Sequence, residues 1–300
     1  MNKYLLCVIG PTAIGKTSLS IKLAKHFNTE ILSADSRQFF KEMTIGTAVP
    51  EKEELAKAKH HFIQHISIEQ PYSVGDFERD ATSLLRKLFK SNDVVIMVGG
   101  SGLYVDSITK GLDDFPEIDE SLRKKLNKDL KIKGLKYLQT KLKELDEKAY
   151  NSITLENPRR VTRALEICLQ TGEPYSSFLE KKENNREFKS IYIGLTADRD
   201  IIYDRINERV DLMVANGLLE EAKALISKQH LNALQTVGYK ELFEYFNNKW
   251  GLDFAISEIK KNTRRFAKRQ LTWYRKNKDV KWFDYQTNSE DIINYLEEKI

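Results

Sequence analysis

The sequence predicts an α/β fold with a mainly parallel sheet. Short, continuously apolar runs recur along the chain, and stretches with apolar residues at helical spacing lie between them. Buried parallel strands have this apolar character, and their connections are helical. Three of the runs end in Gly-rich or polar clusters. In a parallel sheet such clusters converge beyond the carboxyl ends of the strands, where ligands bind.

Each expected element follows from a change in this residue pattern. Apolar runs predict strands, and the apolar repeat that begins at Ser18 predicts the first helix. The segments expected to be strands are 4–9, 30–34, 62–66, 93–98 and 190–195.

Residues 112–188 interrupt the pattern. They are rich in Lys, Leu and Glu, contain no strand-like run, and show helical spacing. We therefore predict a helical insertion domain at 112–188 within a core made of 1–111 and 189–300. The C-terminal part of that core is expected to be helical from Arg199 to Lys278. Helices in the insertion are expected at 121–131, 135–144 and 158–170.

Composition excludes several classes of protein. The 300 residues are 41% hydrophobic and 31% charged, which is typical of a globular chain and not of a disordered or fibrous one. No apolar run approaches the roughly 20 residues that span a bilayer. Two cysteines, Cys7 and Cys168, provide neither a disulfide framework nor a zinc quartet. We expect a soluble protein of the reducing cytoplasm that binds no membrane.

The net charge of +5 is unevenly distributed. Residues 258–281 hold ten basic and two acidic side chains, a local charge of +8, so the rest of the chain sums to −3. Arg265, Arg269 and Lys276 are expected on one face of an amphipathic helix. Such a block indicates a polyanionic partner, and a simple solvated helix face is the alternative.

A phosphate-binding loop follows the first strand. Its glycines let backbone N–H groups close on phosphate oxygens, Lys16 adds a positive charge, and Thr17 offers a hydroxyl to Mg²⁺. A chance Gly-rich turn is the alternative, but the loop stands between a strand and a helix as phosphate binding requires. The loop consists of Gly10, Pro11, Thr12, Ala13, Ile14, Gly15, Lys16 and Thr17.

The second strand ends in Asp35-Ser36-Arg37-Gln38. Asp35 is the one carboxylate at the end of an expected strand, and it is placed to accept a proton or to reach Mg²⁺ through water. A polar helix N-cap is the alternative. The strand expected at 93–98 ends in Gly99-Gly100 instead of the metal-binding Asp of many nucleotide hydrolases. The adjoining Ser101 offers a hydroxyl, in a turn that lets a ligand approach the backbone.

Two groups of arginines point to anionic partners. Arg159, Arg160 and Arg163 lie in the first turns of a predicted helix, the end that disfavours cations. Pairing with Glu156 and Glu166 is the alternative.

Arg209, with Arg199 and Arg205, follows the strand expected at 190–195, where a lid over phosphates is expected. A histidine metal site is not expected, because no acidic or thiol ligands cluster with His60, His61 and His65.

In order and completeness, the motifs resemble the tRNA isopentenyltransferase family, the tRNA dimethylallyltransferases of bacteria. The resemblance covers nearly the whole chain, although no single motif beyond the phosphate loop is decisive. The matching motifs lie at 10–17, 33–38, 45–48, 98–104, 157–166, 237–241 and 263–273.

The resemblance implies a P-loop core similar to that of adenylate kinase, and transfer of dimethylallyl from its diphosphate to N6 of the adenosine 3′-adjacent to the anticodon. Asp35, Ser101 and Lys16 would be catalytic. Ser101 stands where many relatives have Thr. The diphosphate would be held by residues 10–17 and Arg209, with Mg²⁺ near Thr17. The partners would be the anticodon stem-loop and dimethylallyl diphosphate, and the chain a monomer.

The resemblance also implies which residues contact tRNA. The insertion and the basic helix would grip the anticodon stem, chiefly through its phosphates. The expected contacts are Asp35, Ser36, Arg37, Gln38, Ser101, Arg123, Arg159, Arg160, Val161, Thr162, Arg163, Lys268 and Arg269.

Three other functions remain open at this point. A transferase that prenylates free AMP or ADP would share the phosphate loop and Asp35, but would not need the insertion or the basic block. A P-loop kinase for a small metabolite would consume ATP. A non-enzymatic RNA-binding module would leave the phosphate loop unexplained.

Overall fold

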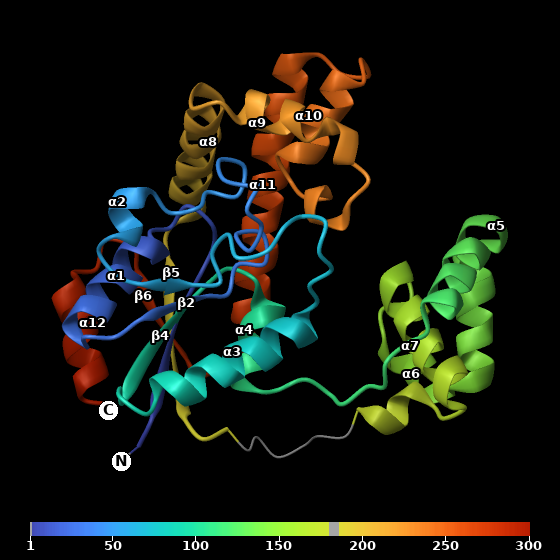
Figure 1. Ribbon diagram of the computed structural model, residues 1–300, viewed down its shortest axis with the longest axis horizontal. Coiled ribbons are helices and arrows are strands. Elements are labelled where there is room, and N and C mark those ends of the chain that lie inside the picture. Colours follow the sequence, from blue (N-terminus) through green and yellow to red (C-terminus); the bar gives the residue numbers. More distant parts are fainter. Residues whose placement is uncertain (1, 180–185) are drawn as a thin grey trace. The chain divides into compact units, whose positions relative to one another are not determined.

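The computed structural model describes residues 2–179 and 186–300. The chain forms two compact units (Figure 1). Unit 1 consists of Met1–Gly111 and Arg186–Ile300, and unit 2 of Leu112–Asn185. Among the described residues, no helix has the length and apolar character needed to cross a membrane.

Unit 1 contains a six-stranded sheet in which every neighbouring pair is parallel. The strand order is β3-β2-β4-β1-β5-β6, so the two strands that begin the fold, β1 and β2, flank β4. Every residue of β1, β2 and β4 is buried, which explains their apolar sequences. The strands are β1 Tyr4–Ile9, β2 Ile31–Ser33, β3 His60–His61, β4 Val94–Val98, β5 Lys189–Thr196 and β6 Val280–Asp284.

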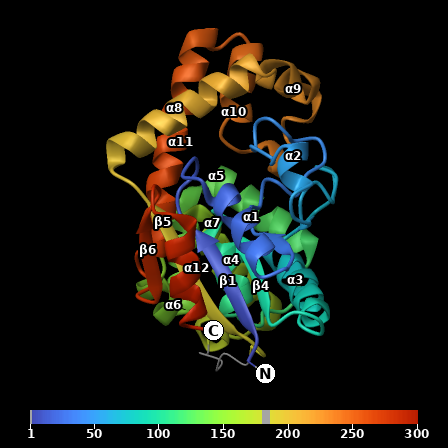
Figure 2. The same cartoon turned by 90° about the vertical axis from the view of Figure 1, so that its left-hand side faces the viewer.

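Helices cover both faces of this sheet (Figure 2). Each face of the sheet has its own hydrophobic core, and alternate residues of β1 belong to different ones. Leu6 and Val8 pack with α1 and α12 on one face, while Leu5 and Ile9 pack with α3 and α4 on the other. A third core joins α8, α9, α10 and α11 to the segment around Met43. The helices are α1 Lys16–His26, α2 Lys52–Leu55, α3 Val74–Leu88, α4 Gly102–Thr109, α8 Arg199–Ala215, α9 Leu218–Ala224, α10 Tyr239–Phe246, α11 Leu252–Tyr274 and α12 Ser289–Glu297.

Unit 2 is helical and has its own core. The Asn157 side chain caps α7, Pro158 takes its first position, and Gly172 ends it with a φ of 76°. Gly134, with φ 79°, breaks α5 in the middle. The helices are α5 Glu120–Leu145, α6 Glu147–Ser152 and α7 Pro158–Thr171.

The strand expected at 62–66 is wrong. The strand is His60–His61, and Ile66 forms only an isolated bridge with Phe40. Phe62 and Gln64 have φ angles of 62° and 47°, which no continuous strand accommodates.

The helical C-terminal part is also shorter than expected. α11 ends at Tyr274, so Lys276 is not on the helix, and Lys281 lies in β6. The basic block is therefore a helix, a turn and an edge strand. The β6 sequence was missed because it mixes charged and aromatic residues, as a strand paired on one side only can.

Candidate active site

The phosphate loop crosses from β1 to α1 in a conformation that its glycines make possible. Gly10 has a φ of 143°, and a Cβ there would lie 2.5 Å from the backbone oxygen of Leu195 in β5. Gly15 has a φ of 105° directly before the first residue of α1. The loop therefore passes tightly over the end of the sheet and delivers Lys16 and Thr17 at a helix N-terminus.

Lys16 is held within the loop that it completes. Its Nζ donates a hydrogen bond of 2.7 Å to the backbone oxygen of Pro11. Burial lowers the pKa of the Lys16 ammonium to about 8, the charge of Asp35 opposes this shift, and Arg209 adds to it. Lys16 is therefore mostly charged at neutral pH, and an arriving anion would relieve the cost of its burial.

Asp35 lies just past β2 in a turn and not in a helix. Its Oδ1 accepts a 3.1 Å hydrogen bond from the backbone N–H of Arg37, and residues 36–39 form turns. The helix N-cap interpretation is thus wrong. Burial raises the pKa of the Asp35 carboxyl, against the opposing effects of the Arg37 bond and of Lys16. A carboxylate with a raised pKa is a better proton acceptor than a solvated one.

Ser101 links the ends of β2 and β4. Its Oγ accepts a 3.2 Å hydrogen bond from the backbone N–H of Ser36 and lies 3.2 Å from the Ser36 hydroxyl. Asp35 and Ser101 are therefore fixed on neighbouring turns at the carboxyl edge of the sheet, as the sequence predicts.

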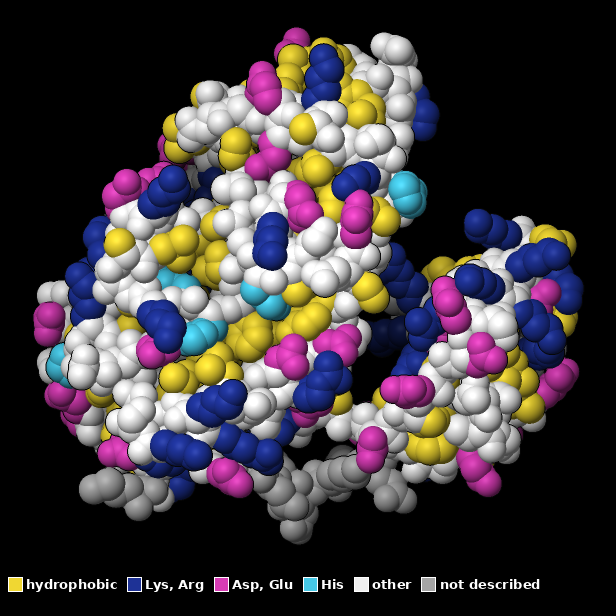
Figure 3. Space-filling view, viewed as in Figure 1, with side chains coloured by type: hydrophobic (Ala, Val, Ile, Leu, Met, Phe, Trp, Pro, Cys, Tyr) yellow, Lys and Arg dark blue, Asp and Glu magenta, His cyan; other side chains and the backbone are white. Residues whose placement is uncertain are grey.

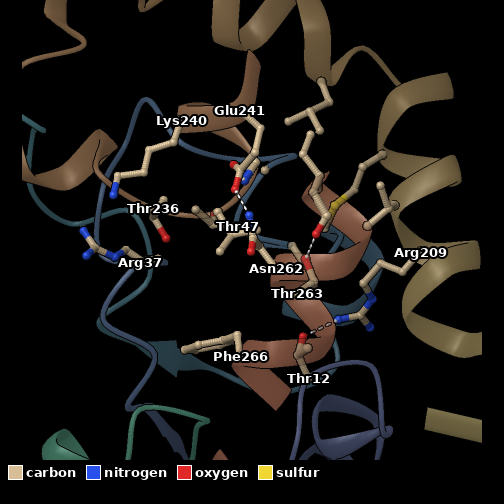
Figure 4. Close-up of a pocket in the computed structure, with 18 of the residues that line it drawn as sticks. Thr12, Arg37, Thr47, Arg209, Thr236, Lys240, Glu241, Asn262, Thr263 and Phe266 are labelled. Atoms are coloured by element: carbon tan, nitrogen blue, oxygen red, sulfur yellow. Dashed lines mark hydrogen bonds between the residues drawn. The ribbon is translucent and has the colours of Figure 1, made fainter. Parts of the chain in front are cut away.

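Two arginines of α8 reach the phosphate loop. Arg209 donates to the Thr12 hydroxyl over 3.4 Å, and Figure 4 shows its guanidinium pointing toward Thr12. Arg205 donates to the backbone oxygen of Ala13 over 2.8 Å. Arg199 instead lies over the ring of Tyr203. Arg209 is largely buried, and this burial lowers its pKa from that of a free guanidinium.

Two cavities meet at Asp35. One, of about 550 Å³, is lined by Ser36, Arg37 and Ser101 and by residues of α8 to α11; we call it the helix-side cavity. The other, of about 670 Å³, is lined by residues 12–18; we call it the P-loop cavity. The residues that line both are Thr12, Asp35, Thr47, Ala48, Arg209 and Met213. A group held in one cavity can therefore meet a group held in the other beside the Asp35 carboxylate.

The side chains of Arg37 and Gln38 hold neighbouring loops. Arg37 Nη1 donates to the backbone oxygens of Asn232 and Ala233, at 3.1 and 2.9 Å. Gln38 Nε2 donates to the backbone oxygen of Ala48 at 2.9 Å. Both side chains thus shape the cavity walls in this structure.

Gln270 of α11 is a site residue that the sequence analysis missed. Its Oε1 accepts a 2.9 Å hydrogen bond from the Thr12 backbone N–H, and its Nε2 donates 3.0 Å to the backbone oxygen of Gly100. It is buried, on the same helical face as Ala267 and Tyr274. A polar residue within an apolar stripe was the signal that could have identified it.

On α11, Lys268 and Arg269 are exposed, and Arg269 also lines the helix-side cavity. Other cations of the same helix are already paired. Lys260 contacts Asp211 at 2.6 Å, and Lys261 contacts Glu258 at 2.7 Å.

In unit 2, two of the arginines predicted to contact RNA form ion pairs with one glutamate. Arg123 binds Glu166 at 2.8 and 3.3 Å, and Arg163 reaches the same carboxylate at 3.2 Å. For Arg163 this is the alternative that the sequence left open. Arg159 and Arg160 are exposed, whereas Val161 and Thr162 are buried in unit 2.

The P-loop cavity carries oxygen donors suited to Mg²⁺. The Thr17 and Asp35 side chains line it, and Mg²⁺ in phosphate sites takes one or two protein oxygens together with phosphate oxygens. The described residues contain no group of three or more His, Cys, Asp or Glu side chains that could hold a metal ion. His61 instead lies 2.5 Å from Glu30.

Comparison of the sequence with known proteins gives consistent matches. The family model described as IPP transferase matches residues 38–277. A protein of Christiangramia forsetii named tRNA dimethylallyltransferase is 62% identical over 300 residues, with 100% of this chain and 99% of that protein covered. A protein of the same name from Flavobacterium johnsoniae is 58% identical, with 99% and 98% covered.

Solved structures give the same match. The full-length tRNA isopentenylpyrophosphate transferase of Bacillus halodurans has a TM-score of 0.74 and 38% identity, covering 99% of this chain and 97% of that one. A eukaryotic dimethylallyltransferase acting on tRNA has a TM-score of 0.84 and 25% identity, covering 100% and 78%. The predicted α/β fold with a mainly parallel sheet and helical parts is confirmed.

Proposed function

Because this chain belongs to the IPP transferase family, we propose that it transfers a dimethylallyl group from dimethylallyl diphosphate to N6 of the adenosine 3′-adjacent to the anticodon of tRNA. The observation that carries the proposal is the position of Asp35, on the wall shared by the P-loop cavity and the helix-side cavity. A diphosphate on the loop and an adenine in the other cavity would meet at this carboxylate.

The P-loop cavity would hold the leaving group. Lys16, the loop amides and Arg209 present positive charge and N–H donors to the diphosphate, and its charge grows as the allylic C–O bond breaks. Mg²⁺, held by the Thr17 hydroxyl and diphosphate oxygens, would add to this neutralisation when bound. A phosphate loop without a metal-binding Asp at the end of β4 suits a diphosphate that leaves intact, because no terminal phosphoryl group is transferred.

The helix-side cavity would hold the adenine. A stacked base is out of reach, so the nucleotide must leave the anticodon loop and enter the cavity beside Ser101 and Asp35. N6 then bonds to the allylic carbon, the carbon–oxygen bond to diphosphate breaks, and one N6 proton passes to Asp35. Because the exocyclic amine is nearly non-basic, its orientation contributes more than its deprotonation.

Basic surfaces would hold the RNA. Lys268 and Arg269 are exposed on α11. In unit 2, nine of the 26 residues of α5 are basic and three are acidic, and Figure 3 shows Lys and Arg side chains gathered over α5. Phosphate contacts of this kind make affinity fall steeply with salt. The proposal includes a monomer acting in the cytoplasm, where tRNA is available.

One labelling experiment tests the proposal. The protein is incubated with Mg²⁺ and dimethylallyl diphosphate labelled in the allyl group, together with an anticodon stem-loop that carries the target adenosine. A matched stem-loop carries guanosine at that position, and AMP replaces RNA in a third reaction. Label on the adenosine stem-loop alone is expected. Label on AMP would support the free-nucleotide transferase. Consumption of ATP, added to a parallel set of the same reactions, without label transfer would support a kinase.

A further inference from the structure

A short loop, residues 44–48, forms part of the wall of both cavities. Gly46, Thr47 and Ala48 line the helix-side cavity, and Thr44, Ile45, Thr47 and Ala48 line the P-loop cavity. Figure 4 shows Thr47 at the cavity wall. The position of this loop therefore sets the width of the passage in which acceptor and leaving group would meet.

A single carboxylate of α9 holds the loop from behind. Glu221 Oε2 accepts hydrogen bonds from the backbone N–H groups of Thr44 and Ile45, at 3.0 and 2.9 Å. Its Oε1 accepts from the N–H of Gly46 at 2.9 Å and from the Tyr239 hydroxyl at 2.6 Å. Four donors converge on one carboxylate, a charge-assisted arrangement stronger than neutral hydrogen bonds.

The surroundings leave the loop little freedom. A Cβ on Gly46 would lie 2.6 Å from the ring of Tyr239, so the backbone packs directly on that ring. On the other side, Gln38 donates to the backbone oxygens of Thr47 and Ala48, at 3.3 and 2.9 Å. Gln38 follows Asp35 by three residues. The loop is thus fixed between Glu221 and the turn that carries Asp35.

We propose that Glu221 is a positioning residue for prenyl transfer: its carboxylate fixes residues 44–48 so that N6, and not water, meets the allylic carbon. The inference rests on the proposed function. If the loop relaxes, the acceptor is misplaced while the P-loop still holds the diphosphate. Water can then attack the allylic carbon, so that its oxygen bonds to carbon, diphosphate leaves, and a proton passes to solvent.

The test is the ratio of dimethylallyl alcohol to prenylated stem-loop in Glu221→Gln and the parent protein. The amide keeps one acceptor oxygen and places an NH₂ group against the loop N–H groups. We expect the ratio to rise by about tenfold or more, since a misplacement near 1 Å can cost ~100-fold in a positioned reaction. The Kd for dimethylallyl diphosphate should stay unchanged. Loss of folded protein would lower both products equally and leave the ratio constant.

Two further variants complete the experiment. Glu220→Gln removes an exposed carboxylate from the adjacent position of α9 and should match the parent. If Glu221→Gln does not fold, Tyr239→Phe, which deletes one of the four donors, is measured in its place and should raise the ratio less. A ratio equal to that of the parent in a folded variant would overturn the role of Glu221. A parent protein that prenylates no RNA would instead refute the proposed function.

Discussion

The buried ammonium of Lys16 predicts a specific pH dependence of diphosphate binding. With a pKa of about 8, Lys16 is about nine-tenths charged at pH 7 and about one-tenth charged at pH 9. Burial lowers this pKa because it penalises the charged form, which a bound diphosphate would stabilise. If only the charged form binds tightly, the affinity should fall about tenfold over this range, which is ~1.4 kcal/mol.

Titration calorimetry with dimethylallyl diphosphate, without RNA and at constant ionic strength and Mg²⁺, measures this effect. The terminal phosphate of the ligand is already ionised at neutral pH, so a change in affinity between pH 7 and 9 comes from a titrating group of the protein. Lys16→Arg keeps its charge throughout and should give a flat profile. Lys22→Met, which removes an exposed lysine of the same helix, should keep the parent profile. An affinity of the parent that does not change between pH 7 and 9 would refute the assigned role of Lys16.

Three other predictions concern the Asp35 carboxylate, the buried Gln270 side chain and the exposed cations of α11. Asp35→Asn should slow single-turnover transfer by about 100-fold or more with little change in the Kd for tRNA. An unchanged rate would argue against Asp35 as the acceptor of the N6 proton. Gln270→Leu should lower the free energy of unfolding by ~1–3 kcal/mol in denaturant titration, because the buried Gly100 oxygen and the partly buried Thr12 N–H lose their partners, whereas the exposed Thr272→Ala should cost much less. Changing Lys268 and Arg269 to Ala should weaken tRNA binding and reduce its salt slope by about one for each phosphate that is no longer neutralised, with diphosphate affinity unchanged.

The sequence predicts the part of the fold in which local pattern and burial agree. β1 and β4 are apolar because both faces are covered, so their sequences identify them as strands. The edge strands β3 and β6 are short or partly exposed, and their mixed sequences carry no such pattern. The same limit applies to the site. Asp35 and Lys16 follow strands in a recognisable order, whereas Glu221 and Gln270 contact the site from helices remote in sequence.

The turn after β4 shows why side-chain contacts were harder to predict than motifs. The sequence suggested that its glycines let a ligand approach the backbone. In the structure α11 takes that space: a Cβ on Gly100 would lie 2.1 Å from Gln270, and one on Gly102 would lie 2.3 Å from the ring of Trp273. The Tyr274 hydroxyl donates to the backbone oxygen of Gly99. These glycines therefore let α11, the helix that carries the exposed cations, pack closely on the turn after β4. Gln270 ties α11 to both ends of the site, through the Thr12 N–H of the phosphate loop and the Gly100 oxygen after β4.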